Sequence, residues 1–223
     1  MKVLVGGRGT IGRSLLEATH FDLVLNSDDI DSIRGLSIDL LVCAAPSGNR
    51  LDINTNPEKD NHDINQLISV FSDCNIKTLV LISTVDTIAN PNTVYGHNRL
   101  RLETFVKTHS NYYILRPSTL VGKNIKKNVL FDLTNRLYLD KIDSDAILQW
   151  CLLDDIYNQI EKAILNNTRE VTLVSEPITN KEIIDKFFSS VTALSRNSGV
   201  HYDIQPYQYT KQQIFDAIER YLK

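Results

Sequence analysis

The stretch "VYGHNRLRLE" places a tyrosine and an arginine four positions apart, Tyr95 and Arg99. Residues at positions i and i+4 of a helix share one face, so the guanidinium of Arg99 is expected beside the phenol of Tyr95. A cation next to a phenol favours its ionised form. Such a phenol exchanges a proton with a hydroxyl or a carbonyl, so Tyr95 is predicted to be a general acid and base.

Two hydroxyl residues precede this tyrosine. The apolar run "TLVLI" ends in Ser83 and Thr84, and Thr84 lies eleven residues before Tyr95. We expect the Thr84 hydroxyl to hold the reacting oxygen of a substrate, with Ser83 as the second choice.

Glycines crowd the start of the chain, "MKVLVGGRGTIGRSLL". Gly7, Gly9 and Gly12 fit the spacing G-x-G-x-x-G, and Gly6, Gly9 and Gly12 equally fit G-x-x-G-x-x-G. Between a strand and a helix, such glycines allow a tight turn and let a pyrophosphate approach the backbone at the positive end of the helix. The motif predicts dinucleotide binding, although a glycine-rich turn without a ligand is the alternative. The predicted contacts of this turn are Gly6, Gly7, Arg8, Gly9, Thr10, Ile11 and Gly12.

The end of the second expected strand bears on the choice of dinucleotide. An acid there would hold the 2′-hydroxyl of NAD, but the sequence has Asn26 and Ser27. Arg8, in the glycine turn, can reach a 2′-phosphate. Asp28 and Asp29 argue in the other direction. NADP is the predicted cofactor, with NAD as the alternative, and Asn26 and Ser27 are predicted to contact it.

The elements that must position these residues alternate between strands and helices, and the strands are apolar nearly throughout. This pattern predicts an α/β fold with a doubly wound parallel sheet, Rossmann-like, covered on both faces. Residues 1–120 are expected to form the dinucleotide-binding core, and residues 121–223 a small substrate-binding lobe interleaved with its last elements. Strands are expected at 2–5, 22–26, 39–45, 78–83, 112–115 and 170–174, and helices at 11–18, 60–71, 95–109, 154–166, 181–189 and 211–223.

The composition of the chain limits the classes of partner that it is expected to bind. A net charge of −3 over 223 residues offers no general basic field for nucleic acid, which favours a small-molecule substrate. No apolar stretch approaches the roughly 20 residues of a membrane helix. The cysteines, three in number and far apart, indicate reduced thiols in the cytoplasm, and no cysteine or histidine cluster suggests a metal.

Seven segments in order resemble the extended short-chain dehydrogenase/reductase family, in the epimerase/dehydratase branch that acts mostly on nucleotide sugars. They are "GGRGTIG", "CAAP", "LISTVD", "YGHNRLRLE", "YILRPSTLVG", "LLDDIYNQIEKAI" and "VSEPITNKEIIDKF", and they span nearly the whole chain. The resemblance implies hydride transfer at a sugar carbon, with Tyr95 as acid/base, Thr84 as its partner and Arg99 in the place of a lysine that binds the nicotinamide ribose.

The resemblance also implies further contacts and an assembly. Family members often pair through two helices, here 60–71 and 95–109, so a homodimer is expected. Asn49, Arg50, Asp86 and Lys123 are candidate substrate contacts, and for Lys123 a solvated loop is the alternative. The additional residues placed at the cofactor are Cys43, Ala44, Ala45, Tyr95, Arg99 and Pro117.

Three departures from the family pattern limit the activity. Arginine is bulkier than lysine and planar, so Arg99 is not a conservative replacement. The segment between Asn26 and Asp39 is short, which predicts a missing strand at one sheet edge and an open adenine pocket. Val85 and Asp86 replace the Asp-Glu pair of the dehydratases, which favours a reductase or an epimerase.

Two other functions fit the same residues. A dinucleotide-binding sensor or regulatory protein would keep the fold without turnover, and the Arg99 replacement favours it. A reductase of a carbonyl compound other than a sugar is the third hypothesis.

Overall fold

The structure is a computed structural model that describes residues 1–192, 194–196 and 202–223. Its contacts divide the chain into two compact units. The first contains Met1–Arg116 and Asp155–Val171, and the second contains Pro117–Asp154 and Thr172–Lys223. The division expected at residue 120, between a dinucleotide-binding core and a substrate-binding lobe, stays a prediction.

A parallel sheet of six strands forms the centre of the first unit, and it confirms the predicted fold class. Its strand order is β11-β7-β6-β4-β1-β2, and the pairs from β7 to β2 run parallel. Parallel strands buried on both faces need continuous apolar runs, which "VLV" and "LVLI" supply. The strands are β1 (Lys2–Val5), β2 (Leu23–Leu25), β4 (Leu40–Cys43), β6 (Leu79–Ile82), β7 (Tyr112–Pro117) and β11 (Glu170–Leu173).

The sheet is shortened beside β2, as the sequence predicts. In the common doubly wound order 3-2-1-4-5-6 another strand lies outside the second one. Here β2 is the terminal strand, and a single 3₁₀ turn, η1 (Ile30–Ile33), follows it. The next strand, β3 (Ser37–Ile38), pairs instead with β5 (Asn75–Ile76) in a separate two-stranded sheet.

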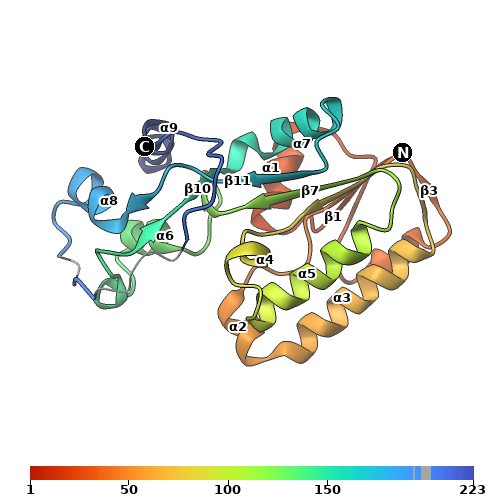
Figure 1. Cartoon of the computed structure of the whole chain (residues 1–223), viewed down its shortest axis with the longest axis horizontal. Helices are drawn as coiled ribbons and strands as arrows, with labels where there is room; N and C mark the ends of the chain where they lie inside the picture. The colour runs from red at the N-terminus through yellow and green to blue at the C-terminus, as the bar shows by residue number, and fades with distance from the viewer. Residues whose placement is uncertain (193, 197–201) are drawn as a thin grey trace. The chain divides into compact units, whose positions relative to one another are not determined.

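Helices cover both faces of the main sheet (Figure 1). On one face lie α3 (Pro57–Ser72) and α5 (Val94–Val106), and on the other lie α1 (Thr10–Ala18) and α7 (Ile156–Leu165). A cluster of buried apolar side chains fills the core between the sheet and the first pair, with Ile64, Phe71 and Leu102 at 0% exposure. Two short helices, α2 (Arg50–Thr55) and α4 (Asp86–Ala89), lead into α3 and α5.

The second unit is built from short elements. Its strands β8 and β10 pair parallel, and β9 and β12 pair antiparallel. Capping boxes at Thr179 and Thr210 start its two last helices. Within the described residues, no helix combines the length and the apolar character that a bilayer span requires. The elements are β8 (Thr119–Val121), α6 (Val129–Asn135), η2 (Leu139–Lys141), β9 (Ile147–Leu148), β10 (Trp150–Leu152), η3 (Leu153–Asp155), β12 (Ile178–Thr179), α8 (Asn180–Phe187) and α9 (Lys211–Leu222).

Candidate functional site

The glycine turn connects β1 to α1, and two of its glycines are required by the packing. Gly6 has a φ of +95°, and a Cβ there would lie 2.8 Å from the carbonyl carbon of Ala44. A Cβ on Gly12 would lie 2.1 Å from the carbonyl oxygen of Gly6. The first helical turn therefore packs directly on the loop, which is the close approach expected of a dinucleotide-binding turn.

Gly9 differs from Gly6 and Gly12 because the space beside its Cα is not filled by closely packed protein atoms. Among the residues that the structure describes, a Cβ there would meet only the Gly6 carbonyl oxygen within 4 Å, at 3.3 Å. Gly9 is also the N-cap of α1, where no side chain caps the helix and no acid lies in the first turn. The positive end of α1 is thus not neutralised by its own residues, and a pyrophosphate fits this position.

The end of β4 lies against the same turn. Cys43 is fully buried and its thiol donates to the carbonyl oxygen of Ala45 at 3.3 Å, while Ala44 and Ala45 are half-buried. Burial raises the pKa of the Cys43 thiol to about 12. Cys43 is therefore a neutral packing residue, and a cofactor beside it would meet the backbone of the two alanines.

At the adenosine side, Arg8 forms an ion pair with Asp28 at 2.6 Å. The hydrogen bond from Arg8 lowers the pKa of Asp28, and Asp28 in turn raises the pKa of Arg8. The backbone N–H of Arg8 donates to Asn26, and the Ser27 hydroxyl donates to Asp28. The cation expected to meet a 2′-phosphate is thus already paired with an acid.

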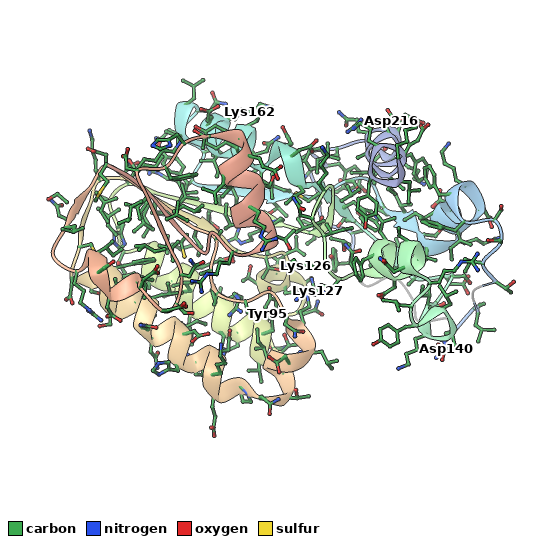
Figure 2. The ribbon with its side chains drawn as sticks, turned by 180° about the vertical axis from the view of Figure 1, so that it is seen from behind. Tyr95, Lys126, Lys127, Asp140, Lys162 and Asp216 are labelled. Atoms are coloured by element: carbon green, nitrogen blue, oxygen red, sulfur yellow. The ribbon has the colours of Figure 1, made fainter. Side chains whose placement is uncertain are left out.

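Tyr95 lies in the first turn of α5 (Figure 2). Thr93 caps this helix by accepting the Gly96 N–H. The side chain of Tyr95 is largely buried, at 7% exposure. The guanidinium carbon of Arg99 lies 4.5 Å from the centre of its ring, so the two residues share a helix face as predicted.

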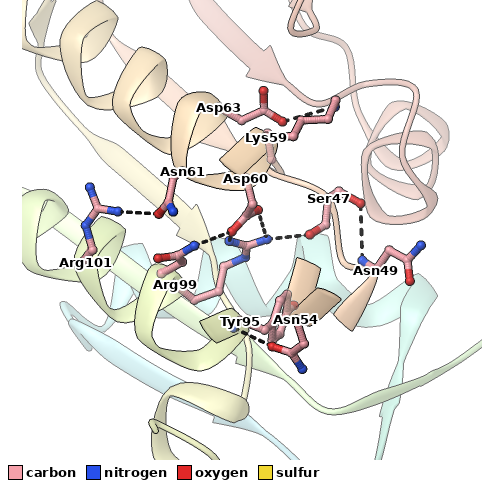
Figure 3. A network of polar contacts seen from close by, with 12 residues as sticks. Ser47, Asn49, Asn54, Lys59, Asp60, Asn61, Asp63, Tyr95, Arg99 and Arg101 are labelled. Atoms are coloured by element: carbon pink, nitrogen blue, oxygen red, sulfur yellow. Dashed lines mark hydrogen bonds and ion pairs between the residues drawn. The ribbon is translucent and has the colours of Figure 1, made fainter. Parts of the chain in front are cut away.

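The guanidinium of Arg99 forms an ion pair with the buried carboxylate of Asp60 (Figure 3). It donates to both oxygens of Asp60, at 3.0 and 2.8 Å, and to the carbonyl oxygen of Ser47 at 2.6 Å. Asn98 donates to the same carboxylate at 2.9 Å. Arg99 and Asp60 are 4% and 3% exposed, so this is a closed pair that joins α3, α5 and the loop after β4.

The two hydroxyl candidates donate to different carboxylates. Ser83 donates to Glu103 at 2.6 Å, and Glu103 also accepts from Thr87 and from Arg116. Glu103 is 0% exposed, so the Ser83 proton is held in the interior of the unit. Thr84 is itself only 5% exposed and donates to a carboxylate that is also buried, so both hydroxyls are engaged alike and the preference for Thr84 stays a prediction.

Thr84 belongs to a cluster that reaches Tyr95 through a second arginine. The Thr84 hydroxyl donates to Asp86 at 3.0 Å, and Asp86 forms an ion pair with Arg50 at 2.6 Å. The guanidinium carbon of Arg50 lies 5.9 Å from the centre of the Tyr95 ring. The ring is therefore contacted by two arginines, each paired with an aspartate.

The remaining candidates lie outside this cluster. Asn49 is exposed at the N-cap of α2, next to Arg50. Pro117, buried at the end of β7, and Lys123, exposed after β8, belong to the second unit. Their proposed contacts with cofactor and substrate stay predictions.

Sequence reasoning missed two residues of the site, Asp60 and Asn54. Asn54 accepts the backbone N–H of Tyr95 at 3.0 Å and so ties α2 to α5. Asp60 could have been found from its position, because it lies on the same helix face as the buried Ile64 and Leu67. A carboxylate on a buried face requires a partner, and Arg99 is that partner.

No protein-family model matches the chain, and no curated protein matches its sequence. Solved structures do match its fold, at low identity. The dTDP-4-dehydrorhamnose reductase of Bacillus anthracis, solved with NADP, is 15% identical with a TM-score of 0.66, and the match covers 99% of each chain. The UDP-glucose 4-epimerase of Thermus thermophilus, solved with NAD, is 13% identical with a TM-score of 0.66, covering 90% of this chain and 85% of that one.

A third structure is larger than this chain. The capsular polysaccharide assembling protein CapF of Staphylococcus aureus is 19% identical with a TM-score of 0.60. The match covers 82% of this chain but only 55% of CapF, so the chain spans about half the length of that protein. These likenesses show a shared Rossmann-like fold.

Proposed function

We propose that this chain is an NAD(P)-dependent oxidoreductase or epimerase that acts on a hydroxyl or keto group of a nucleotide sugar. The observation that carries the proposal is the cluster around Tyr95, in which Arg50 lies against the tyrosine ring and pairs with Asp86, which accepts the Thr84 hydroxyl. A phenol and a hydroxyl held in one site can bind one oxygen of a substrate and exchange its proton. The nucleotide-sugar enzymes that share the fold support this choice of substrate.

In this proposal, different residues of the first unit bind the cofactor, orient the substrate and transfer the proton. The backbone around Gly9 and the start of α1 would hold a pyrophosphate, and the backbone of Ala44 and Ala45 would face the nicotinamide ribose. A nicotinamide cofactor bound there would supply the hydride chemistry. Thr84 orients the reacting oxygen, and Tyr95 gives or takes its proton. NADP is the proposed cofactor, although the pairing of Arg8 with Asp28 leaves NAD a close alternative.

Tyr95→Phe tests this proposal because it removes the proton and keeps the ring. Turnover of NADPH or NADH with a panel of keto-sugar nucleotides and simple carbonyl compounds is expected to fall about 10²- to 10⁴-fold. Cofactor affinity, measured by fluorescence titration, is expected to fall by no more than about fivefold, because only one hydroxyl is lost from the predicted cofactor contacts. A variant with unchanged turnover would refute the role of Tyr95, and turnover limited to simple carbonyls would replace the sugar substrate.

A specific observation favours a second candidate, a dinucleotide-binding sensor. Asp60 and Ser47 accept three hydrogen bonds from Arg99, the residue in the place of the family's lysine. A cation committed in this way contributes less to a cofactor or to the phenol. Cofactor binding without oxidation by any compound of the same panel would support the sensor.

The assembly and the compartment are also proposals. We infer a homodimer through α3 and α5, and light scattering at micromolar concentration tests it, since a monomer would refute it. A cytoplasmic location is supported by the cysteines, all three described, because none is joined in a disulfide.

A further inference from the structure

Arg50 presents an unused edge of its guanidinium beside Tyr95. Its Nη2 faces Asp86, and half of its side-chain surface (50%) is exposed. Within the described ranges of the chain, no acceptor receives a hydrogen bond from its Nε or Nη1. A guanidinium has five N–H donors, so several of them face solvent next to the candidate acid/base.

Asp86 does not need these free donors. Its Oδ1 accepts from Asn90 at 2.8 Å, and its Oδ2 accepts from Thr84 at 3.0 Å and faces Arg50. The carboxylate is 3% exposed and has a partner on each oxygen. One edge of Arg50 is therefore enough to balance Asp86, and the other edge remains for a second anion.

The fold fixes where this edge lies. Asn54 on α2 accepts the N–H of Tyr95 at 3.0 Å, and Ile53 anchors α2 with 4% exposure. Arg50 begins the same short helix, so its backbone is held one helical turn from the contact with Tyr95.

We propose that Arg50 is an anion-recognition residue of the Tyr95 site, binding an oxyanion of the substrate with its free edge while Asp86 keeps the other. The planar fork of a guanidinium matches two oxygens of a carboxylate or a phosphate. The substrate class is thus narrowed to compounds with such a group within reach of the reacting carbon. The inference rests on the proposed function for the role of Tyr95, and it extends that function by naming a recognition group.

The source of the oxyanion is decided by two probes that differ in one group. UDP-glucuronate carries a ring carboxylate in addition to its diphosphate, and UDP-glucose carries only the diphosphate. Calorimetric titrations of both probes are made with wild type, Arg50→Gln and Arg101→Gln. Arg101→Gln is the control. Arg101 lies on α5 in the same unit and donates to Asn61 and Asn65, so this variant also removes one positive charge but not one that contacts Tyr95.

Arg50→Gln is expected to weaken at least one probe by fivefold or more, and Arg101→Gln to change neither by as much as twofold. A loss confined to UDP-glucuronate identifies a carboxylate, and an equal loss for both probes identifies the diphosphate. A loss below fivefold for both probes, or a wild type that binds neither at millimolar concentration, would overturn the proposal.

A double variant removes the effect of an unpaired Asp86. Arg50→Gln with Asp86→Asn is expected to bind as weakly as Arg50→Gln alone, and a return to wild-type affinity would assign the loss to the stranded carboxylate and overturn the proposal. Titrations are repeated with and without NADPH or NADH. If neither cofactor binds, the proposed function fails while the result for Arg50 is still decided by the probes.

Discussion

Two arginine–aspartate pairs contact the ring of Tyr95, and they differ in their access to solvent. In the Arg99–Asp60 pair both side chains are less than 5% exposed, and three hydrogen bonds from Arg99 have protein acceptors. In the Arg50–Asp86 pair the aspartate is equally buried but the arginine is half exposed. Two ion pairs of the same residue types therefore differ in role. The closed pair joins three segments of the chain, and the open pair keeps donors that can still bind a ligand.

The largest effect is expected from Asp60→Ala, which leaves the buried Arg99 without its counter-ion. Breaking a buried pair on one side costs about 3–5 kcal/mol of unfolding free energy. Chemical denaturation measures it, with Asp63→Ala as the control, because Asp63 faces the exposed Lys59 at 3.5 Å on the same helix. The control is expected to change stability by less than about 0.5 kcal/mol. Equal losses in both variants would contradict the closed pair.

Arg99→Lys is expected to have an intermediate effect. Lysine keeps the charge but cannot donate to both oxygens of Asp60 and to Ser47 with one planar fork. A loss of about 1–3 kcal/mol in unfolding free energy is expected, from at least one unmade hydrogen bond to a buried charged acceptor. A variant as stable as the wild type would show that the fork of Arg99 has no structural role, and a gain in turnover would show that arginine limits catalysis.

Arg50→Gln is expected to cost less stability than Asp60→Ala, about 1–2 kcal/mol, because the buried carboxylate of Asp86 loses its counter-ion but keeps hydrogen bonds from Thr84 and Asn90. The same denaturation experiment gives this value beside that of Asp60→Ala. A cost as large as that of Asp60→Ala would mean that both pairs are structural, and the distinction between them would disappear.

A third pair, Arg8–Asp28, extends the comparison to a pair exposed on both sides, at 68% and 61%. Asp28→Asn removes an anion from the place expected for a 2′-phosphate and releases Arg8. The affinity for NADPH relative to NADH is expected to rise about two- to fivefold. Asp31→Asn, which alters an exposed pair with Arg34, is the control. A constant ratio in Asp28→Asn would place the 2′ position elsewhere.

The parts of the molecule that the sequence predicts well have local signals. The glycine spacing and the apolar runs are each contained in fewer than twenty residues, and the i, i+4 relation of Tyr95 and Arg99 follows from helix geometry alone. The structure confirms the parallel sheet, its short edge and the contact between these two residues.

The partners of the site residues could not be predicted because they are distant in sequence. Asp60 and Arg99 are 39 positions apart, and their pairing depends on how α3 and α5 pack on the sheet. Ser83 and Glu103 are 20 positions apart, so their hydrogen bond could not be predicted for the same reason. The catalytic and binding roles of these residues stay predictions.

The terminal position of β2 also affects how this chain behaves at high concentration. An edge strand offers unpaired backbone groups on which another chain can add a strand, the first step of aggregation. β2 has only three residues, about 10 Å of backbone, and it is followed at once by a polar stretch that includes Asp28 and Asp29. The exposed edge of this sheet is thus short and is followed by two acids, which makes it a poor template for a strand of another chain.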